Sequence, residues 1–215
     1  MSRSRTAALV LVGTLVSSSL LAGCGGDDKD DKPDAQESPT ASATLTPVPP
    51  AEETPSAQEV DFGKPAKGAK IEGSTYTYKV PVDWIDNTGS AREVNSEIDT
   101  SGAEADGSDG FRNNVTVTSI VATGGNLDDL EADIAIQLED VAKKIDQLDR
   151  VLVDGRPMAH HVGVMKAKPV NYQLDQYSGI DDEGRVTVIA FSYARNVPEK
   201  ARTRTTNAIL ASWKW

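Results

Sequence analysis

Residues 185–194 have the sequence Arg-Val-Thr-Val-Ile-Ala-Phe-Ser-Tyr-Ala, a strand pattern that is apolar at both sets of alternating positions. One set is Val186, Val188 and Ala190, and the other is Ile189, Phe191 and Tyr193. Because successive side chains of a strand point to opposite faces, this strand would be buried on both faces. The pattern therefore predicts a central strand in a sheet that is covered on each side.

The most regular helical pattern covers residues 127–148. Large apolar side chains recur there at steps of three and four, namely at Leu127, Leu130, Ile134, Leu138, Val141, Ile145 and Leu148. This spacing places them on one stripe of a helix, which would pack on the sheet. Asn126 is placed to cap the helix, and Asp128 and Asp129 complement its positive N-terminal end.

Further strand patterns lie on both sides of this helix. The predicted strands are residues 74–84, 114–123, 151–153, 157–166 and 170–179, with the last three separated by turn-forming residues. Residues 87–110 are rich in Gly, Ser and Asp and are predicted to be mostly loop, with a short strand at 94–98. Pro198 opens a final helix that ends in residues 209–213. The order predicts an α+β domain whose antiparallel sheet is flanked by helices on both faces.

The N-terminal segment has the features of a secretory signal. Arg3 and Arg5 precede a mostly apolar run, which is shorter than the roughly 20 residues that a membrane-spanning helix needs. The ending Leu21-Ala22-Gly23-Cys24 resembles the lipobox of bacterial lipoproteins. This resemblance implies cleavage after residue 23 and a diacylglycerol thioether on Cys24, so we expect a lipid anchor at the outer face of the cytoplasmic membrane. A plain signal peptide followed by a chance cysteine is the alternative.

Residues 24–65 are predicted to be a disordered tether that carries the lipidated cysteine. The segment is rich in Asp, Pro, Ser, Thr and Ala, and it has hardly any large apolar residues. Residues 66–215 are then long enough for one ordinary domain.

Composition excludes several classes of partner and cofactor. The formal net charge is -11, whereas binding to nucleic acid requires clusters of Lys and Arg. Cys24 is the only cysteine, so no intramolecular disulfide can form. We expect a monomer without a metal or another cofactor.

The chain lacks the arrangements that carry common catalysis. There is no Gly-x-Ser-x-Gly motif, and the two histidines, His160 and His161, are adjacent on a predicted strand and would face opposite ways. One of them is expected in the core and the other at the surface. The acidic runs 27–31 and 181–183 lack the spacing of a calcium-binding loop. We therefore expect a protein that is not an enzyme.

Several local signatures resemble the PsbP-like family of α/β/α sandwich domains, and within it the LpqN-type lipoproteins of actinobacteria. The matching pieces are Tyr78-Lys79-Val80-Pro81-Val82-Asp83-Trp84, Phe111-Arg112-Asn113-Asn114-Val115, Val153-Asp154-Gly155-Arg156-Pro157 and the final Ser212-Trp213. Asp83 stands where this family usually has Gly. The resemblance implies a PsbP-like sandwich and a role in binding, since members of the family serve as extrinsic subunits, adaptors and lipoproteins.

Two functions from different classes remain open. The first is a binding or adaptor domain for a protein of the cell envelope, and the second is a carrier of an apolar envelope lipid in a pocket between the sheet and a helix. Trp84, Trp213 and Trp215 are the candidate binding residues and are expected to be exposed, because aromatic side chains concentrate binding energy in interfaces. An apolar cavity of several hundred cubic ångströms would favour the carrier.

Replacing Cys24 by Ala should release the protein from the membrane, because two acyl chains are the expected anchor and one would bind only marginally. Fractionation of cells that produce Cys24→Ala measures the outcome. A mature-length variant that stays in the membrane pellet would contradict the lipid anchor.

Overall fold

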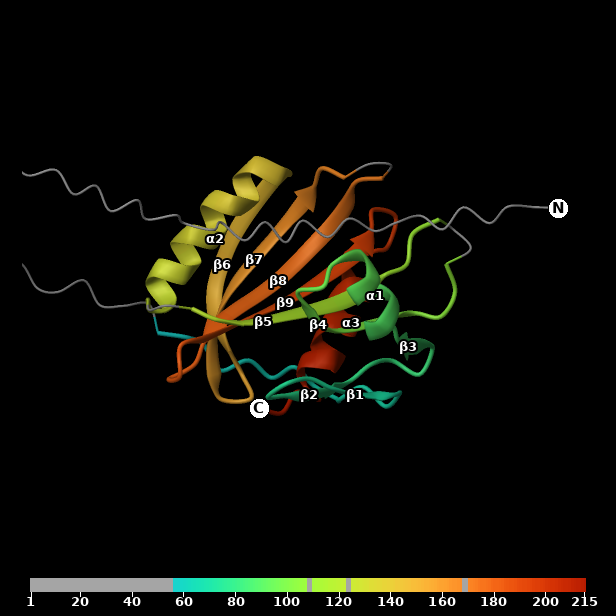
Figure 1. Ribbon diagram of the computed structural model, residues 1–215. Helices are drawn as coiled ribbons and strands as arrows, with labels where there is room; N and C mark the ends of the chain where they lie inside the picture. The colour runs from blue at the N-terminus through green and yellow to red at the C-terminus, as the bar shows by residue number, and fades with distance from the viewer. Residues whose placement is uncertain (1–55, 108–109, 123–124, 168–169) are drawn as a thin grey trace, which may run out of the picture. The chain divides into compact units, whose positions relative to one another are not determined.

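The computed structural model describes residues 56–107, 110–122, 125–167 and 170–215. They form an α+β domain in which three helices pack against a seven-stranded antiparallel sheet, and a second sheet pairs β1 with β2 (Figure 1). The elements follow one another as β1 (Lys70–Glu72), β2 (Thr77–Lys79), β3 (Trp84–Asp86), α1 (Thr88–Val94), β4 (Ile98–Glu104), β5 (Asn114–Val121), α2 (Leu127–Val141), β6 (Ala142–Val153), β7 (Arg156–Met165), β8 (Tyr172–Ile180), β9 (Arg185–Ala194) and α3 (Glu199–Leu210). The predicted signal peptide, Cys24, the acidic run 27–31 and the tether up to residue 55 lie outside the described residues.

Strand β9 is the central strand of the large sheet, whose order is β3-β4-β5-β9-β8-β7-β6. It has the predicted bounds and pairs with β5 and β8. Ile189 and Phe191 belong to one buried cluster, whereas Ala190 and Ala194 belong to another. The prediction of a central strand buried on both faces is confirmed.

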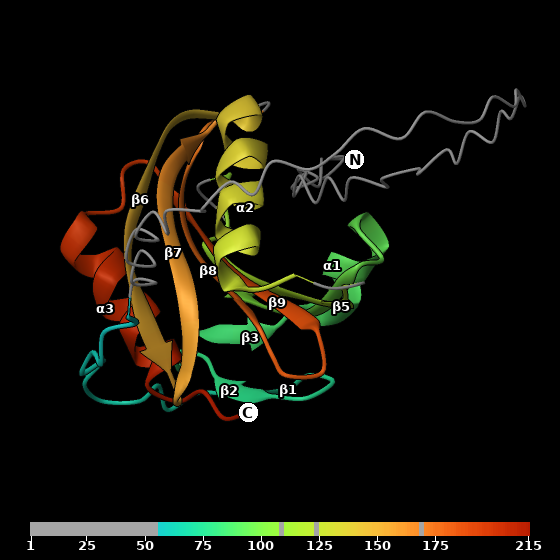
Figure 2. The ribbon, with the colours of Figure 1, turned by 90° about the vertical axis from the view of Figure 1, so that its left-hand side faces the viewer.

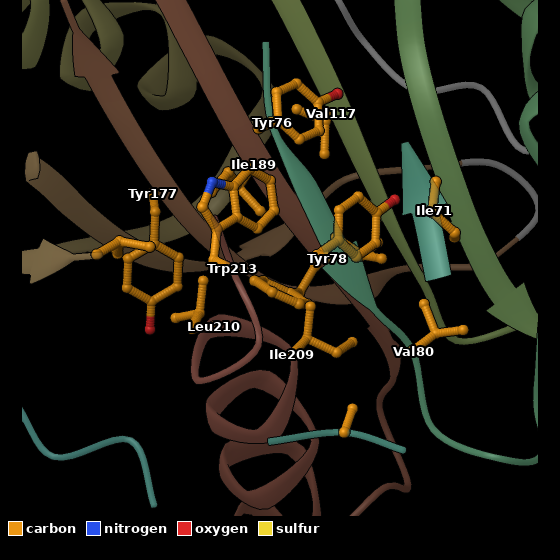
Figure 3. Close-up of a cluster of buried hydrophobic side chains, with 14 of the residues drawn as sticks. Ile71, Tyr76, Tyr78, Val80, Val117, Tyr177, Ile189, Ile209, Leu210 and Trp213 are labelled. Carbon is orange, nitrogen blue, oxygen red and sulfur yellow. The ribbon is translucent and has the colours of Figure 1, made fainter. Parts of the chain in front are cut away.

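One buried cluster joins the sheet to α3. Ile209 and Leu210, at the end of this helix, are buried beside Trp213 and the side chains of β9 (Figure 3). Tyr78 of β2 and Ile71 of β1 belong to the same cluster, so the small sheet helps to close it.

The second cluster joins the sheet to α2, which lies on the opposite side of the sheet from α3 (Figure 2). Ile134 and Leu138 of α2 are buried there with Leu174 of β8. At the N-terminus of the helix, the Asn126 side chain accepts hydrogen bonds from the amides of Asp128 and Asp129 at 2.8 and 3.0 Å. The predicted cap is confirmed.

The predicted C-terminal end of this helix is wrong. α2 ends at Val141, and residues 142–148 form the first part of β6, which pairs with β7. Ile145 and Leu148 continue the helical spacing, but in the strand they face opposite sides, and Leu148 is 43% exposed. Hydrogen bonding to β7 therefore overrides the local helical pattern.

The first predicted strand is interrupted. β2 covers only Thr77–Lys79, and a turn follows in which the amide of Trp84 donates to the carbonyl of Pro81 at 3.0 Å. Pro81 has no amide hydrogen, so it cannot continue a strand ladder. Val82, which lies within the predicted strand, is 80% exposed. Asp83 is not among the described residues with positive φ, so this turn does not require the usual Gly.

The segment predicted as mostly loop, residues 87–110, instead contains α1 and β4. Val94 ends α1 and Ile98 begins β4, so the predicted strand 94–98 is wrong. In β4, a Cβ on Gly102 would lie 2.6 Å from the Val80 side chain. Packing against Val80 therefore requires a glycine at this position. Glycine is uncommon in strands, so the sequence of β4 does not predict a strand.

The predicted strands and helix in the second half of the chain are largely confirmed. β7, β8 and α3 lie close to the expected bounds, and β5 does so in the first half. The predicted strand 151–153 is the end of the longer β6. Among the described helices, none has the length and apolar character needed to cross a membrane.

Ordered contacts begin before the predicted start of the domain at residue 66. Gln58 forms a parallel bridge with Val151 of β6. Its amide donates to the Arg150 carbonyl at 2.8 Å, and its carbonyl accepts from the Leu152 amide at 2.9 Å. Residues that composition assigned to the tether therefore belong to the folded part.

Replacing Leu138 by Ala should lower the free energy of unfolding by about 2–5 kcal/mol, because the side chain is buried between α2 and the sheet. Glu139 is exposed on the same helix, so Glu139→Ala should change stability by less than about 0.5 kcal/mol. Urea denaturation measures both. Equal losses would refute the orientation of α2.

Candidate functional site

A groove of about 680 Å³ opens at the C-terminal end of α3. We call it the α3 groove, and it is lined by Glu59, Val60, Asp61, Phe62, Gly63, Leu152, Asp154, Gly155, Leu210, Ala211, Trp213 and Lys214. Its volume lies within the ~300–1,000 Å³ range of ligand sites. The segment that leads into the domain and the segment that follows α3 therefore contribute to one site.

Trp213 is held in a stack of aromatic rings at the base of the groove. Its ring centroid lies 4.8 Å from that of Tyr76 and 5.0 Å from that of Tyr78, and it is nearly parallel to both rings (Figure 3). The Trp213 side chain is only 1% exposed. Such packing fixes the base of the groove in one position.

The residues after α3 are tied to β2. Thr77 and Lys214 exchange two backbone hydrogen bonds, of 2.7 and 2.9 Å. The hydroxyl of Ser212 accepts a hydrogen bond from the amide of Lys79 at 2.8 Å. Lys214 therefore lies at a fixed place on the groove wall.

The turn between β6 and β7 contacts the residues after α3 from the other side. Asp154 and Gly155 both have positive φ, of 46° and 83°, as expected in a two-residue hairpin turn. Asp154 pairs with Lys214 and accepts a hydrogen bond from the Trp215 amide at 3.2 Å. The Trp215 indole N–H donates to the Val153 carbonyl at 2.7 Å. The turn and the residues after α3 thus form one continuous wall of the groove.

Residues 59–63 form the opposite wall. Phe62 packs against the cluster around α3, and the Asp61 carboxylate accepts a hydrogen bond from the Gly63 amide at 2.8 Å. Sequence reasoning missed this wall, because the acidic, Pro-rich composition of the preceding residues extends through it to residue 65. Val60 and Phe62, large apolar residues at the end of that stretch, are the signal that could have revealed it.

The charges of the groove are predominantly negative. Glu59, Asp61 and Asp154 contribute carboxylates, and Lys214 contributes the one ammonium group among the lining residues. Lys214 is already paired with Asp154. Glu59 has no hydrogen-bond or ion-pair partner among the described residues. The groove therefore has an acidic wall whose charge is not balanced by the other lining residues.

The three predicted tryptophans have different surroundings. Trp84 is 5% exposed and does not line the groove, and Trp213 lines it but is buried, so the exposure expected of both residues is wrong. Trp215 is partly exposed beside the groove, and the Arg156 guanidinium lies 4.4 Å from its ring centroid. Only Trp215 of the three keeps a face that a partner can reach.

The two histidines face opposite sides of the sheet, as predicted. His160 hydrogen-bonds through Nε2 to Asp175 at 2.8 Å, and Asp175 also accepts from the Thr206 hydroxyl at 3.1 Å. His160 is partly buried by these contacts and not freely exposed as expected. His161 is fully buried, and its ring nitrogens have no hydrogen-bond partner among the described residues. Burial lowers the pKa of His161 below its ordinary value.

Within the described ranges, no three His, Cys, Asp or Glu side chains are placed to hold a metal ion. Asp181, from the acidic run 181–183, instead caps the β8–β9 turn and accepts a hydrogen bond from the Arg185 amide at 2.7 Å. This residue has a structural role in the hairpin.

Comparison with known proteins gives structural likeness alone. No family model matches the sequence, and no curated protein sequence matches it. The structure is similar to LpqN, which is involved in cell envelope biogenesis of Mycobacterium tuberculosis, with 13% identity and a TM-score of 0.47 over 68% of this chain and 88% of LpqN. It is also similar to a Bacteroides thetaiotaomicron protein, with 12% identity and a TM-score of 0.44 over 68% of this chain. The chain spans about half (48%) of that second protein.

Lowering the pH from about 7 to about 5 should destabilise the domain through His161. In the unfolded chain this ring takes up a proton near its ordinary pKa of about 6.5, whereas the buried ring resists protonation, so stability is present above that pH and is lost below it. The free energy of unfolding can fall by about 1.4 kcal/mol per pH unit.

The His161→Met variant tests this linkage, because it fills the buried position with an apolar side chain that does not titrate. Urea denaturation at several pH values should give a smaller decrease for the variant than for the unchanged protein. The same decrease in both would show that His161 is not the linked group.

Proposed function

We propose that this chain is a non-catalytic binding domain that holds an envelope protein in the α3 groove, and that Cys24 anchors it to the outer face of the cytoplasmic membrane. The groove is the observation that supports binding, because it combines a volume of about 680 Å³ with the exposed side chain of Val60 and with a base held rigid by the buried Trp213 and Leu210. The ending Leu21-Ala22-Gly23-Cys24 supports the lipid anchor. We also propose that the domain is a PsbP-like α/β/α sandwich, in keeping with the separate buried clusters around α3 and α2.

The rigidity of the groove favours binding. Stacking, backbone hydrogen bonds and the turn at Asp154 fix its base and one wall before any partner arrives. Little free energy is therefore lost in ordering the site when a partner binds. Trp215 adds an aromatic face beside the groove, and such residues often dominate interfaces.

The tether would keep this groove near the membrane. The chain enters the domain at Gln58 and immediately forms the wall from Glu59 to Gly63. A flexible segment between Cys24 and Gln58 would reach roughly 30 Å, from about 5 to 6 Å times the square root of its length. A partner in the groove would then be a protein at or close to the membrane surface.

The alternative is a carrier of an apolar envelope lipid. The volume of the groove and its place between Leu210 of α3 and Leu152 of β6 favour this function. Glu59 and Asp61 disfavour it, since an apolar chain would have to lie against carboxylates that need water or a cation. Binding of a protein segment therefore fits the groove better.

Site-specific photocrosslinking in the producing cells tests the proposal. Benzoylphenylalanine at Val60, which is 37% exposed in the groove, should give an adduct with an envelope protein. The same probe at Ile136, which is 64% exposed on α2, should not. Scrambling residues 27–55 should leave the Val60 adduct intact, whereas removing Trp215 should reduce it.

The identity of the adduct separates the two functions. A protein adduct that is specific to Val60 supports the binding domain, and a lipid adduct there supports the carrier. Equal adducts at Val60 and Ile136, or loss of the adduct when the tether is scrambled, would refute recognition by the α3 groove.

A further inference from the structure

The wall from Glu59 to Gly63 has unused backbone groups. Gln58 uses both its amide and its carbonyl in pairing with β6, and the next amide along the chain that donates a hydrogen bond to a described residue is that of Gly63, which donates to Asp61. No described residue hydrogen-bonds to the amides of residues 59–62. Free backbone donors and acceptors beside a groove can pair with the backbone of another chain.

The same wall offers apolar surface. Val60 is 37% exposed, and Phe62 is only partly buried where it packs against the α3 cluster. Leu152, which is partly exposed on β6, continues this surface across the groove, whereas Leu210 and Trp213 are only 2% and 1% exposed. An apolar side chain of a bound segment would therefore lose contact with water there.

The charge of the wall selects among apolar segments. Glu59 has no ionic partner within the described ranges, and the hydrogen bond that the Asp61 carboxylate accepts from a described residue is the one from the Gly63 amide. Lys214, on the opposite wall, is neutralised by Asp154. Two carboxylates are thus available to a cation, whereas an acidic segment or an anionic headgroup would be repelled.

We propose that the occupant of the α3 groove is a peptide segment in which apolar side chains are flanked by Lys or Arg. This inference rests on the function proposed above, and it states the chemistry of the protein partner. The segment's backbone pairs with residues 59–62, its apolar side chains lie over Val60 and Leu152, and its cations contact Glu59 and Asp61.

Fluorescence anisotropy with a defined probe tests this proposal. The probe is the rhodamine-labelled peptide Gly-Lys-Leu-Lys-Leu-Lys-Gly, added to the full mature chain in phosphatidylcholine nanodiscs, with empty nanodiscs as background. The peptide should bind, and its affinity should fall at high salt, which screens exposed charges. Matched peptides with Glu in place of Lys, or Ser in place of Leu, should bind much more weakly.

Two double variants test whether the carboxylates of the wall bind the cations of the peptide. The double substitution Glu59→Gln and Asp61→Asn should weaken peptide binding roughly tenfold, because each exposed ion pair contributes a small factor. Asn at position 61 keeps an oxygen that can accept from the Gly63 amide, and an unchanged thermal unfolding curve checks the fold. Asp133→Asn with Glu139→Gln removes the same net charge from exposed positions on α2 and should leave binding unchanged.

Competition with the Val60 crosslink completes the test. Excess Lys-Leu peptide should suppress the adduct at Val60, and the Glu-Leu peptide should not. Equal binding of the basic and acidic peptides, or equal effects of the two double variants, would overturn the inference. If the peptide does not bind while the Val60 adduct persists, the proposed chemistry is wrong but the groove still binds a protein; if the adduct is absent too, both proposals fail.

Discussion

Trp213 lies against Tyr76 and Tyr78, and much of the domain depends on this stack. The β1–β2 sheet has only three residues in each strand, too few to be stable alone in water. The stack joins that sheet to the residues that follow α3 and thereby holds α3 over β9. Each aromatic pair contributes about 0.5–1.5 kcal/mol beyond the burial of its surface. The base of the α3 groove is thus also part of the core.

Local sequence patterns correctly predicted the elements whose composition is typical of their position in the structure. β9 has apolar residues on both faces because the sheet is covered on both sides, so its place in the sheet could be predicted. β6 could not, because Lys143, Lys144 and Asp146 give an edge strand the composition of a helix surface. Such charges are typical of edge strands, where they hinder pairing with other molecules. Likewise, β4 contains Gly102 to make room for Val80, a contact far away in the sequence.

The site was less predictable than the fold. Trp213 and Trp215 could be named from residue type, and the structure brings both to the end of α3. Their exposure could not be predicted, since it depends on rings contributed by the start of the domain. Residues 59–63 were assigned to the tether because charge and proline content describe a segment's average and do not reveal one bridge at Gln58. A single pair of long-range hydrogen bonds decides where the folded part begins.

The bridge at Gln58 also has a mechanical consequence. In a protein tethered by its N-terminus, any pulling force enters the fold at the two hydrogen bonds between Gln58 and the edge strand β6. The next residues along the chain are the wall of the α3 groove, held to the core chiefly by Phe62 and then by the bond from the Ala66 amide to the Ala208 carbonyl, of 2.8 Å. Breaking the Gln58 bonds under tension would free that wall while leaving the large sheet intact. If the chain is anchored through Cys24 as proposed, the width of the groove would therefore depend on the load on the tether.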